Sequence, residues 1–149
     1  MPTSLKVILA LIYAGVLLYI SWTDIKTRRI PNVVIGPAIL LALIAMPWTI
    51  GVQPALLGAV IAPLPLIIAR VVAGASKMGM GDIKLAIFVG LILGFDFALI
   101  SLLIGLVLSL VVSFVGVARG IKTWQSKMPF GPYFTAGALP LLLLLTLTL

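Results

Sequence analysis

Acidic residues are rare in this chain, and two of the three lie in segments where a carboxylate could do chemistry. The three are Asp24, Asp82 and Asp96. The chain contains neither histidine nor cysteine, which excludes imidazole bases, thiol nucleophiles, disulfides and cysteine-based zinc sites. Two carboxylates within about 4 Å at an effective dielectric of about 20 repel by roughly 4 kcal/mol, so one keeps its proton near neutral pH. Such a pair can activate water and protonate a scissile amide without a metal or a cofactor.

The segment before Asp82 is rich in glycine. Residues 77–84 read KMGMGDIK, with Gly79 and Gly81 just ahead of the acid. Glycine permits conformations and close approaches that residues with a Cβ resist, so the backbone of a substrate could pass beside Asp82. The alternative is a plain turn in which Asp82 is the N-cap of the next helix.

The other candidate acid, Asp24, precedes a short basic loop that ends in Pro31 and Asn32. Proline and asparagine suit the entry to a second helix. The alternative for Asp24 is a role as an interfacial anchor, paired with Lys26 or Arg28. A dyad with Asp82 is favoured because both acids are expected at the same membrane face.

A third segment, at residues 127–133, reads KMPFGPY and has two prolines and a glycine around an aromatic residue. It predicts a stiff, non-helical entry to the last helix, made of Pro129, Phe130, Gly131 and Pro132. Asp96 is expected in a turn at the opposite face, where it has no acidic neighbour.

The composition predicts that these segments are positioned by membrane helices. Of 149 residues, 63% are hydrophobic and 9% are charged, and the mean hydropathy is +1.36. A helical span needs about 20 apolar residues. Turn formers at 47–54 and 94–97 divide the apolar stretches, so we expect about six transmembrane helices in a single membrane-embedded domain, residues 1–149. The fold class is therefore predicted to be an all-α polytopic membrane protein.

The positive charges support this count, because in a six-helix topology all but Lys6 fall on one side. The others are Lys26, Arg28, Arg29, Arg70, Lys77, Lys84, Arg119, Lys122 and Lys127. Under the positive-inside rule their loops face the cytoplasm, and both termini lie on the extracytoplasmic side. The net charge of +7 is thus explained by the membrane, and no nucleic-acid partner is expected.

The three motifs together resemble those of the type IV prepilin leader peptidase family, the GxGD-type membrane aspartic proteases. Asp24 with residues 30–32, the segment 79–84 and the segment 129–132 are similar to the family's motifs in order and spacing. The resemblance implies that Asp24 and Asp82 are catalytic. It also implies that the remaining motif residues support the site or bind substrate, namely Gly79, Gly81, Lys84, Pro31, Asn32, Pro129, Phe130, Gly131 and Pro132.

By the same resemblance, the substrate is a pilin or pseudopilin precursor whose short basic leader is removed at the cytoplasmic face of the cell membrane. Membrane lipid is the other expected partner, and no cofactor or metal is expected. Larger members have a cysteine-containing amino-terminal region and also N-methylate the new terminus. This chain resembles the compact, peptidase-only branch, so methyltransferase activity is not expected.

Two other functions stay open from the residues alone. One is a small proton-coupled transporter, in which an intramembrane acid relays protons. The other is a non-catalytic assembly factor of a pilus or secretion machine. The sequence does not specify the oligomeric state or the individual pilin.

Overall fold

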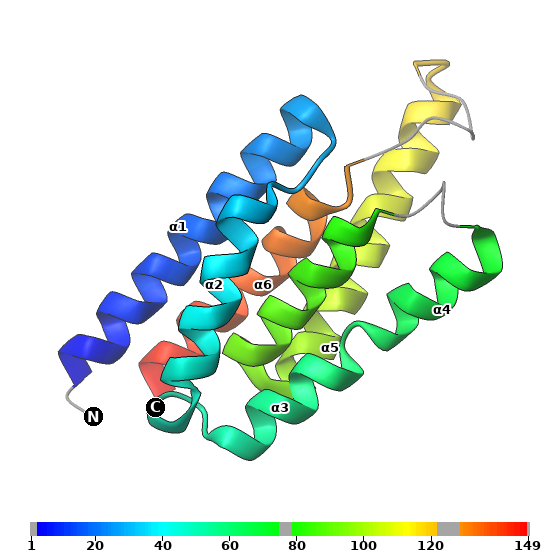
Figure 1. The fold of residues 1–149 in the computed structure, drawn as a ribbon. Helices are drawn as coiled ribbons and strands as arrows, with labels where there is room; N and C mark the ends of the chain where they lie inside the picture. Colours follow the sequence, from blue (N-terminus) through cyan, green and yellow to red (C-terminus); the bar gives the residue numbers. More distant parts are fainter. Residues whose placement is uncertain (1–2, 75–78, 122–128, 149) are drawn as a thin grey trace.

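The structure, a computed structural model, describes residues 3–74, 79–121 and 129–148, and within them it is helical without strands. Its elements are α1 (Thr3–Thr27), α2 (Asn32–Ala45), the 3₁₀ helix η1 (Met46–Trp48), α3 (Val52–Ile61), α4 (Leu64–Ala73), α5 (Met80–Ala118) and α6 (Gly131–Thr148). The helices lie side by side in a bundle (Figure 1). The predicted all-α class is confirmed.

Several of these helices have the length and apolar character of membrane spans. In the described part of the chain, four stretches qualify: Ser4–Thr27, Val52–Val72, Met80–Ala118 and Gly131–Thr148. A shorter apolar helix covers Asn32–Trp48. These helices support a multi-pass membrane protein, whereas the count of six spans stays a prediction.

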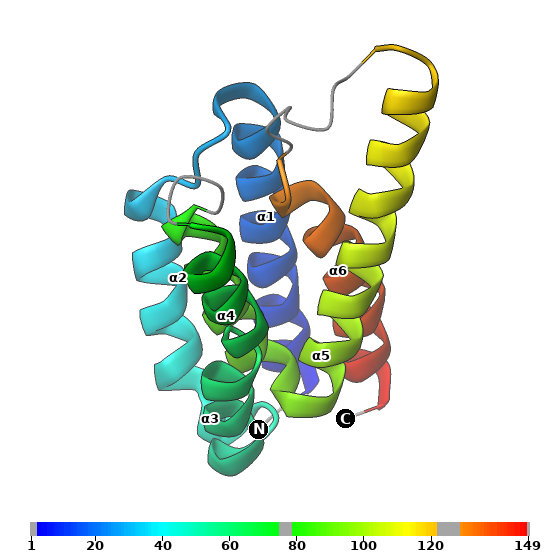
Figure 2. The ribbon, with the colours of Figure 1, turned by 90° about the vertical axis from the view of Figure 1, so that its right-hand side faces the viewer.

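The breaks between helices follow the turn formers in part. The predicted turn near 47–54 is confirmed by η1 and by Gly51, which precedes α3 with φ 95°. The predicted break at 94–97 is reduced to one residue, Gly94, whose φ of 78° lies outside the helical range. At Gly94 the chain reverses direction, so the two parts of α5 lie side by side (Figures 1 and 2). The break at Ala62 and Pro63 between α3 and α4 was not predicted.

Glycines bring the central helices into close contact. Gly58 of α3 and Gly90 of α5 lie so close that a Cβ on either would overlap the backbone of the other. Gly105 of α5 packs against Phe134 of α6, where an added Cβ would lie 2.9 Å from the Phe134 Cα. Small residues permit such approaches between membrane helices. By contrast α4 is loosely packed, and its Val72 is 81% exposed.

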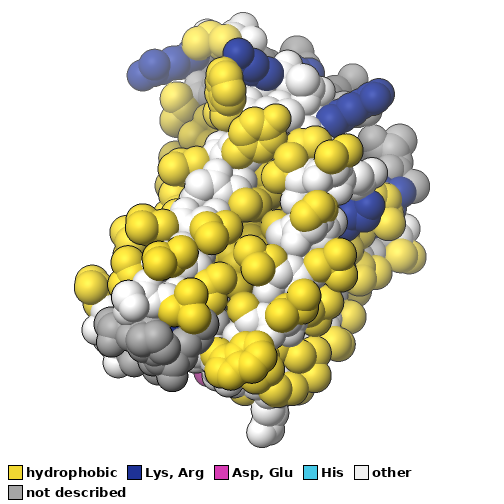
Figure 3. All heavy atoms as spheres, turned by 60° about the vertical axis from the view of Figure 1, so that its left-hand side comes forward, with side chains coloured by type: hydrophobic (Ala, Val, Ile, Leu, Met, Phe, Trp, Pro, Cys, Tyr) yellow, Lys and Arg dark blue, Asp and Glu magenta, His cyan; other side chains and the backbone are white. Residues whose placement is uncertain are grey.

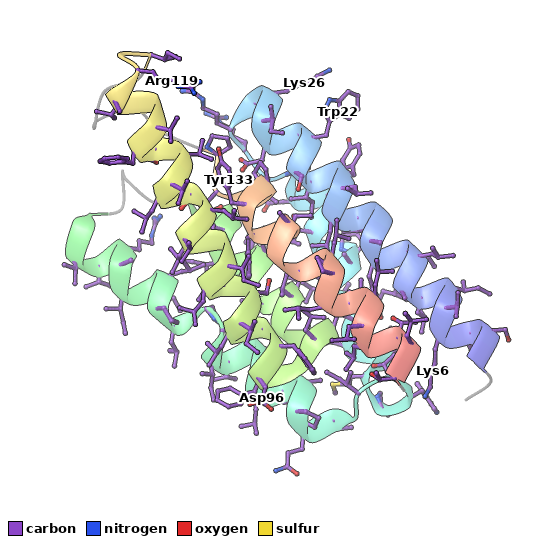
Figure 4. The ribbon with its side chains drawn as sticks, turned by 180° about the vertical axis from the view of Figure 1, so that it is seen from behind. Lys6, Trp22, Lys26, Asp96, Arg119 and Tyr133 are labelled. Atoms are coloured by element: carbon purple, nitrogen blue, oxygen red, sulfur yellow. The ribbon has the colours of Figure 1, made fainter. Side chains whose placement is uncertain are left out.

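The charged residues gather at the ends of the bundle. Lys26 and Arg119 lie at one end, whereas Lys6 and Asp96 lie at the other, which also holds both termini (Figures 1 and 4). The sides between them are mostly hydrophobic (Figure 3). This segregation agrees with the predicted grouping of basic loops, although Lys77, Lys122 and Lys127 lie outside the described residues. Which end faces the cytoplasm stays a prediction.

Candidate active site

Asp24 lies on the buried face of α1. Leu17, Ile20 and Asp24 follow one another at spacings of three and four residues, and all three are buried, with Asp24 only 5% exposed. This face packs against α6, and the Asp24 Oδ2 atom accepts a hydrogen bond of 2.9 Å from the Gly131 N–H. Of the two partners in the interfacial-anchor alternative, Lys26 lies over the Trp22 ring at 4.1 Å, whereas Arg28 lines the same cavity as Asp24.

The start of α6 is built around this hydrogen bond. Gly131 is the first residue of α6, and the Phe130 carbonyl accepts bonds from the next turn. A Cβ on Gly131 would lie 2.7 Å from the Asp24 Oδ2 atom, so only glycine allows the carboxylate to come this close. The free N–H groups and the dipole at a helix N-terminus favour a carboxylate there. The predicted non-helical entry is confirmed at Pro129 and Phe130, but it was wrong for Gly131 and Pro132, which already belong to α6.

Asp82 lies in the first turn of α5. The N-cap is Gly79, with φ −72° and ψ 145°, so the alternative of Asp82 as the N-cap is wrong. Asp82 is instead the third helical residue, and it forms a hydrogen bond with the backbone of Gly79. This bond resembles the return bond of a capping box, in which an acidic side chain satisfies the N–H of the N-cap.

The two candidate acids line one cavity of about 250 Å³. It lies between the end of α1, the start of α2 and the start of α5, and the charge of Asp24 acts on Asp82 across it. The cavity is lined by Asp24, Arg28, Arg29, Ile30, Asn32, Gly79, Met80, Gly81, Asp82 and Lys84. Residues 58 positions apart in the sequence thus share one polar site at the end of the bundle.

Two contacts join the segment that follows Asp24 to the segment around Asp82. Gly81 lies against Ile30, where an added Cβ would come within 2.8 Å of the Ile30 Cβ. The Lys84 Nζ atom donates a hydrogen bond of 2.7 Å to the Asn32 Oδ1 atom. Pro31 is the N-cap of α2, as its predicted place at a helix entry requires. The predicted site residues of both segments are therefore brought together.

The comparison with known families agrees with this arrangement of motifs. The sequence profile of the type IV leader peptidase family matches residues 11–114, a stretch that contains both Asp24 and Asp82. The chain belongs to the type IV leader peptidase family. Neither a curated protein nor a solved structure matches it. The predicted resemblance is confirmed, and membership of a peptidase family supports a hydrolase that acts as a leader peptidase.

Residues 129–132 of the late loop lie beyond the residues that the family profile matches, and they do not line the cavity, but they contact Asp24. Gly131 reaches Asp24 directly. Pro132 is in the first turn of α6, and the Phe130 ring packs on Phe134 with centroids 5.6 Å apart. Tyr133 lies at the same end of the bundle as Lys26 (Figure 4). The loop therefore positions Asp24 through the backbone of Gly131.

The sequence did not identify two cavity residues of this leader peptidase, Arg28 and Arg29. Arg28 has φ 52°, a left-handed conformation that is uncommon outside glycine. In the sequence both arginines resemble an ordinary basic loop beside a membrane helix, so no signal distinguished them. With Lys84 they place three cationic side chains around two carboxylates.

Asp96 is separate from this site. It is exposed at the reversal of α5 and lines a second cavity, of about 310 Å³, at the opposite end of the bundle. Its predicted place in a turn away from the other acids agrees with this position. Among the described residues, no three His, Cys, Asp or Glu side chains converge in a way that could hold a metal ion.

Proposed function

We propose that this leader peptidase is a membrane aspartic endopeptidase that removes the short basic leader of type IV pilin-like precursors. The cavity shared by Asp24 and Asp82 is the observation that carries the proposal. Two coupled carboxylates in a partly enclosed site are what peptide hydrolysis by an aspartic mechanism requires.

In the proposed reaction, the dyad enters with one proton. The ionised carboxylate takes a proton from water as the oxygen attacks the scissile carbonyl carbon, and the protonated one donates to the carbonyl oxygen. The resulting tetrahedral diol collapses when the C–N bond breaks. The proton taken from water passes to the leaving amine, and the carboxylate that gave up its proton takes one back from a diol hydroxyl as the carbonyl reforms, so the dyad again holds a single shared proton. The backbone N–H groups of Gly131 and Gly79 keep the two carboxylates oriented throughout.

The place of the cavity suits a precursor with a leader and an apolar helix. Because the cavity lies at the ends of α1, α2 and α5, a leader could reach it from the membrane surface while the precursor's helix stays in the bilayer. Gly79 leaves space beside Asp82 for an extended backbone, whereas the space at Gly81 is filled by Ile30. Basic side chains at this end favour the cytoplasmic face of the cell membrane. The partners in this proposal are a pilin or pseudopilin precursor and membrane lipid.

The test is cleavage of a pilin precursor that has a basic, glycine-ended leader. Purified wild type, Asp24→Asn, Asp82→Asn and the control Asp96→Asn are incubated with it, and the product masses are measured. Wild type and Asp96→Asn are expected to cut after the glycine, and the other two are not. Cleavage by either dyad variant at the wild-type rate would refute the two-aspartate mechanism.

The alternative of a proton-coupled transporter has less support. A carrier site is expected near the middle of the membrane. Asp24 is in the last turn of α1, Asp82 in the first turn of α5 and Asp96 at its reversal, so each acid lies near an end of the bundle. No observation specifically favours a non-catalytic assembly factor.

A further inference from the structure

We propose that Lys84 and Asn32 are positioning residues, whose hydrogen bond holds Asp82 across the cavity from Asp24. This inference rests on the proposed aspartic peptidase function and assigns a task to two side chains that the reaction itself does not use.

The bond joins the two acidic segments at the cavity. Asn32 is the first residue of α2, and Lys84 lies two residues after Asp82 in α5. The distance from Lys84 Nζ to Asn32 Oδ1 is 2.7 Å, which is short for an N–H···O hydrogen bond and is typical of a charged donor. Both side chains also line the cavity that contains the two carboxylates.

The bond controls the rotation of the first turn of α5. Successive residues of a helix differ by about 100° around its axis, so even a part of one residue's rotation would swing the Asp82 carboxylate away from Asp24. Gly81 against Ile30 gives one contact between the segments, but it is apolar and without direction. The Lys84–Asn32 bond adds a directional contact at the cavity, beside the buried packing of Ile83, Leu85 and Ala86 that holds the next turn of α5.

The chemistry of the pair suits its place. Arg28, Arg29 and Lys84 line the same cavity as Asp24 and Asp82. An acidic partner would neutralise the Lys84 ammonium and add a third carboxylate beside the dyad. The Asn32 amide oxygen accepts the bond without either effect, so the lysine is held in position and its charge is kept.

The alternative is that Lys84 is an interfacial anchor that reaches a lipid phosphate, as lysines at helix ends often do. An anchor extends its ammonium to the membrane surface. Lys84 is partly buried, and although its bond to Asn32 is exposed to solvent, its ammonium is directed to a side chain of another helix. The two roles differ in one respect that can be tested, because only the positioning role depends on Asn32.

The experiment is a double-mutant cycle on cleavage of the glycine-ended precursor, with Lys84→Met, Asn32→Leu and the double variant. Because a displacement of about 1 Å can cost about a hundredfold in rate, each single variant is expected to lose about 10- to 100-fold in kcat. The KM for the precursor and the melting temperature in detergent should stay near those of wild type. The double variant is expected to be no slower than the slower single variant, since both changes break one bond.

Two further variants complete the design. Asn32→Gln keeps a neutral amide oxygen as acceptor and is expected to retain more kcat than Asn32→Leu. Lys26→Met removes a lysine at the same end whose ammonium lies over Trp22, outside the cavity, and is expected to cleave as wild type does.

Several results would overturn the inference. These are wild-type kcat in both single variants, losses that multiply in the double variant, a loss in Lys84→Met alone, or a fall in melting temperature that accounts for the loss of activity. The failure of the proposed function is distinct from these, because it would be seen as an uncut precursor with the wild-type protein itself.

Discussion

The two ends of the bundle each contain a cavity, and the comparison shows what distinguishes a candidate active site from a space between helices. The cavity with Asp96 is the larger, at about 310 Å³ against about 250 Å³. However, it has a single acid among mostly apolar residues, including Phe95 and Phe97. The smaller cavity has two carboxylates and three cationic side chains. The convergence of charged groups, and not volume, marks the site.

The ends also differ in how the acid is held. Asp24 is buried and bonded to the first N–H of α6, and Asp82 is bonded to the N-cap of α5. Asp96 follows the reversal at Gly94 and is exposed. Helix N-termini provide unpaired N–H groups that orient a carboxylate, and an exposed turn does not. A site that depends on the orientation of its carboxylates is therefore expected only at the end with Asp24 and Asp82.

The largest expected effect comes from removing one of the two acids, so that this cavity has a single acid as the cavity with Asp96 does. Asp24→Asn or Asp82→Asn removes a group that takes or gives a proton, so kcat should fall by about 10²- to 10⁴-fold. Initial rates and a binding assay with an uncut precursor would separate chemistry from affinity. Binding is expected to persist, and a variant that retained most of its activity would contradict the assignment.

A smaller effect is expected from disturbing the support of Asp24. In Gly131→Ala the new methyl group would lie 2.7 Å from the Asp24 Oδ2 atom, so the carboxylate or α6 must move. A shift of this kind should lower kcat by about 10- to 100-fold. The matched control is Gly36→Ala in α2, where an added Cβ meets nothing within 4 Å and activity should be unchanged. Equal activity of the two variants would show that the Gly131 contact is not needed.

The close packing of α3 on α5, between the two ends of the bundle, can be tested by measuring the stability of variants. Gly90→Ala would force apart α3 and α5 at Gly58, and overpacking of this kind typically costs about 1–3 kcal/mol. Unfolding in detergent should show the loss. Gly15→Ala in α1, where an added Cβ has no neighbour within 4 Å, is the control and should be as stable as wild type. Similar unfolding curves for both variants would argue against a close α3–α5 contact.

The smallest effect is expected at the opposite end. Asp96→Asn should change kcat less than about twofold, because general acid–base catalysis needs a group within reach of the reacting atoms. The same rate assay measures it. A large loss would mean that the second cavity takes part in the reaction and would remove the contrast between the two ends.

The sequence predicted the class of fold and most of the residues that line the candidate site, because both depend on local signals. Composition alone indicated membrane helices, and Gly94 marked a real break. The contact between Gly131 and Asp24 could not be predicted from the sequence, since it joins residues 107 positions apart. The break at Pro63 was missed because proline also occurs inside membrane helices, where neighbours satisfy the freed backbone groups. Arg28 was missed because its left-handed conformation has no signature in a basic loop.

The shortness of α2 has a consequence for the lipid around the protein. With 14 residues, α2 is about 21 Å long, whereas the hydrocarbon layer of a bilayer is about 30 Å thick. Bilayers adjust to short helices by thinning locally. Since α2 begins at Asn32, in the wall of the cavity shared by Asp24 and Asp82, we expect the headgroup layer to dip at this point. Water and the polar leader could then meet the carboxylates at the membrane surface, without a channel through the protein.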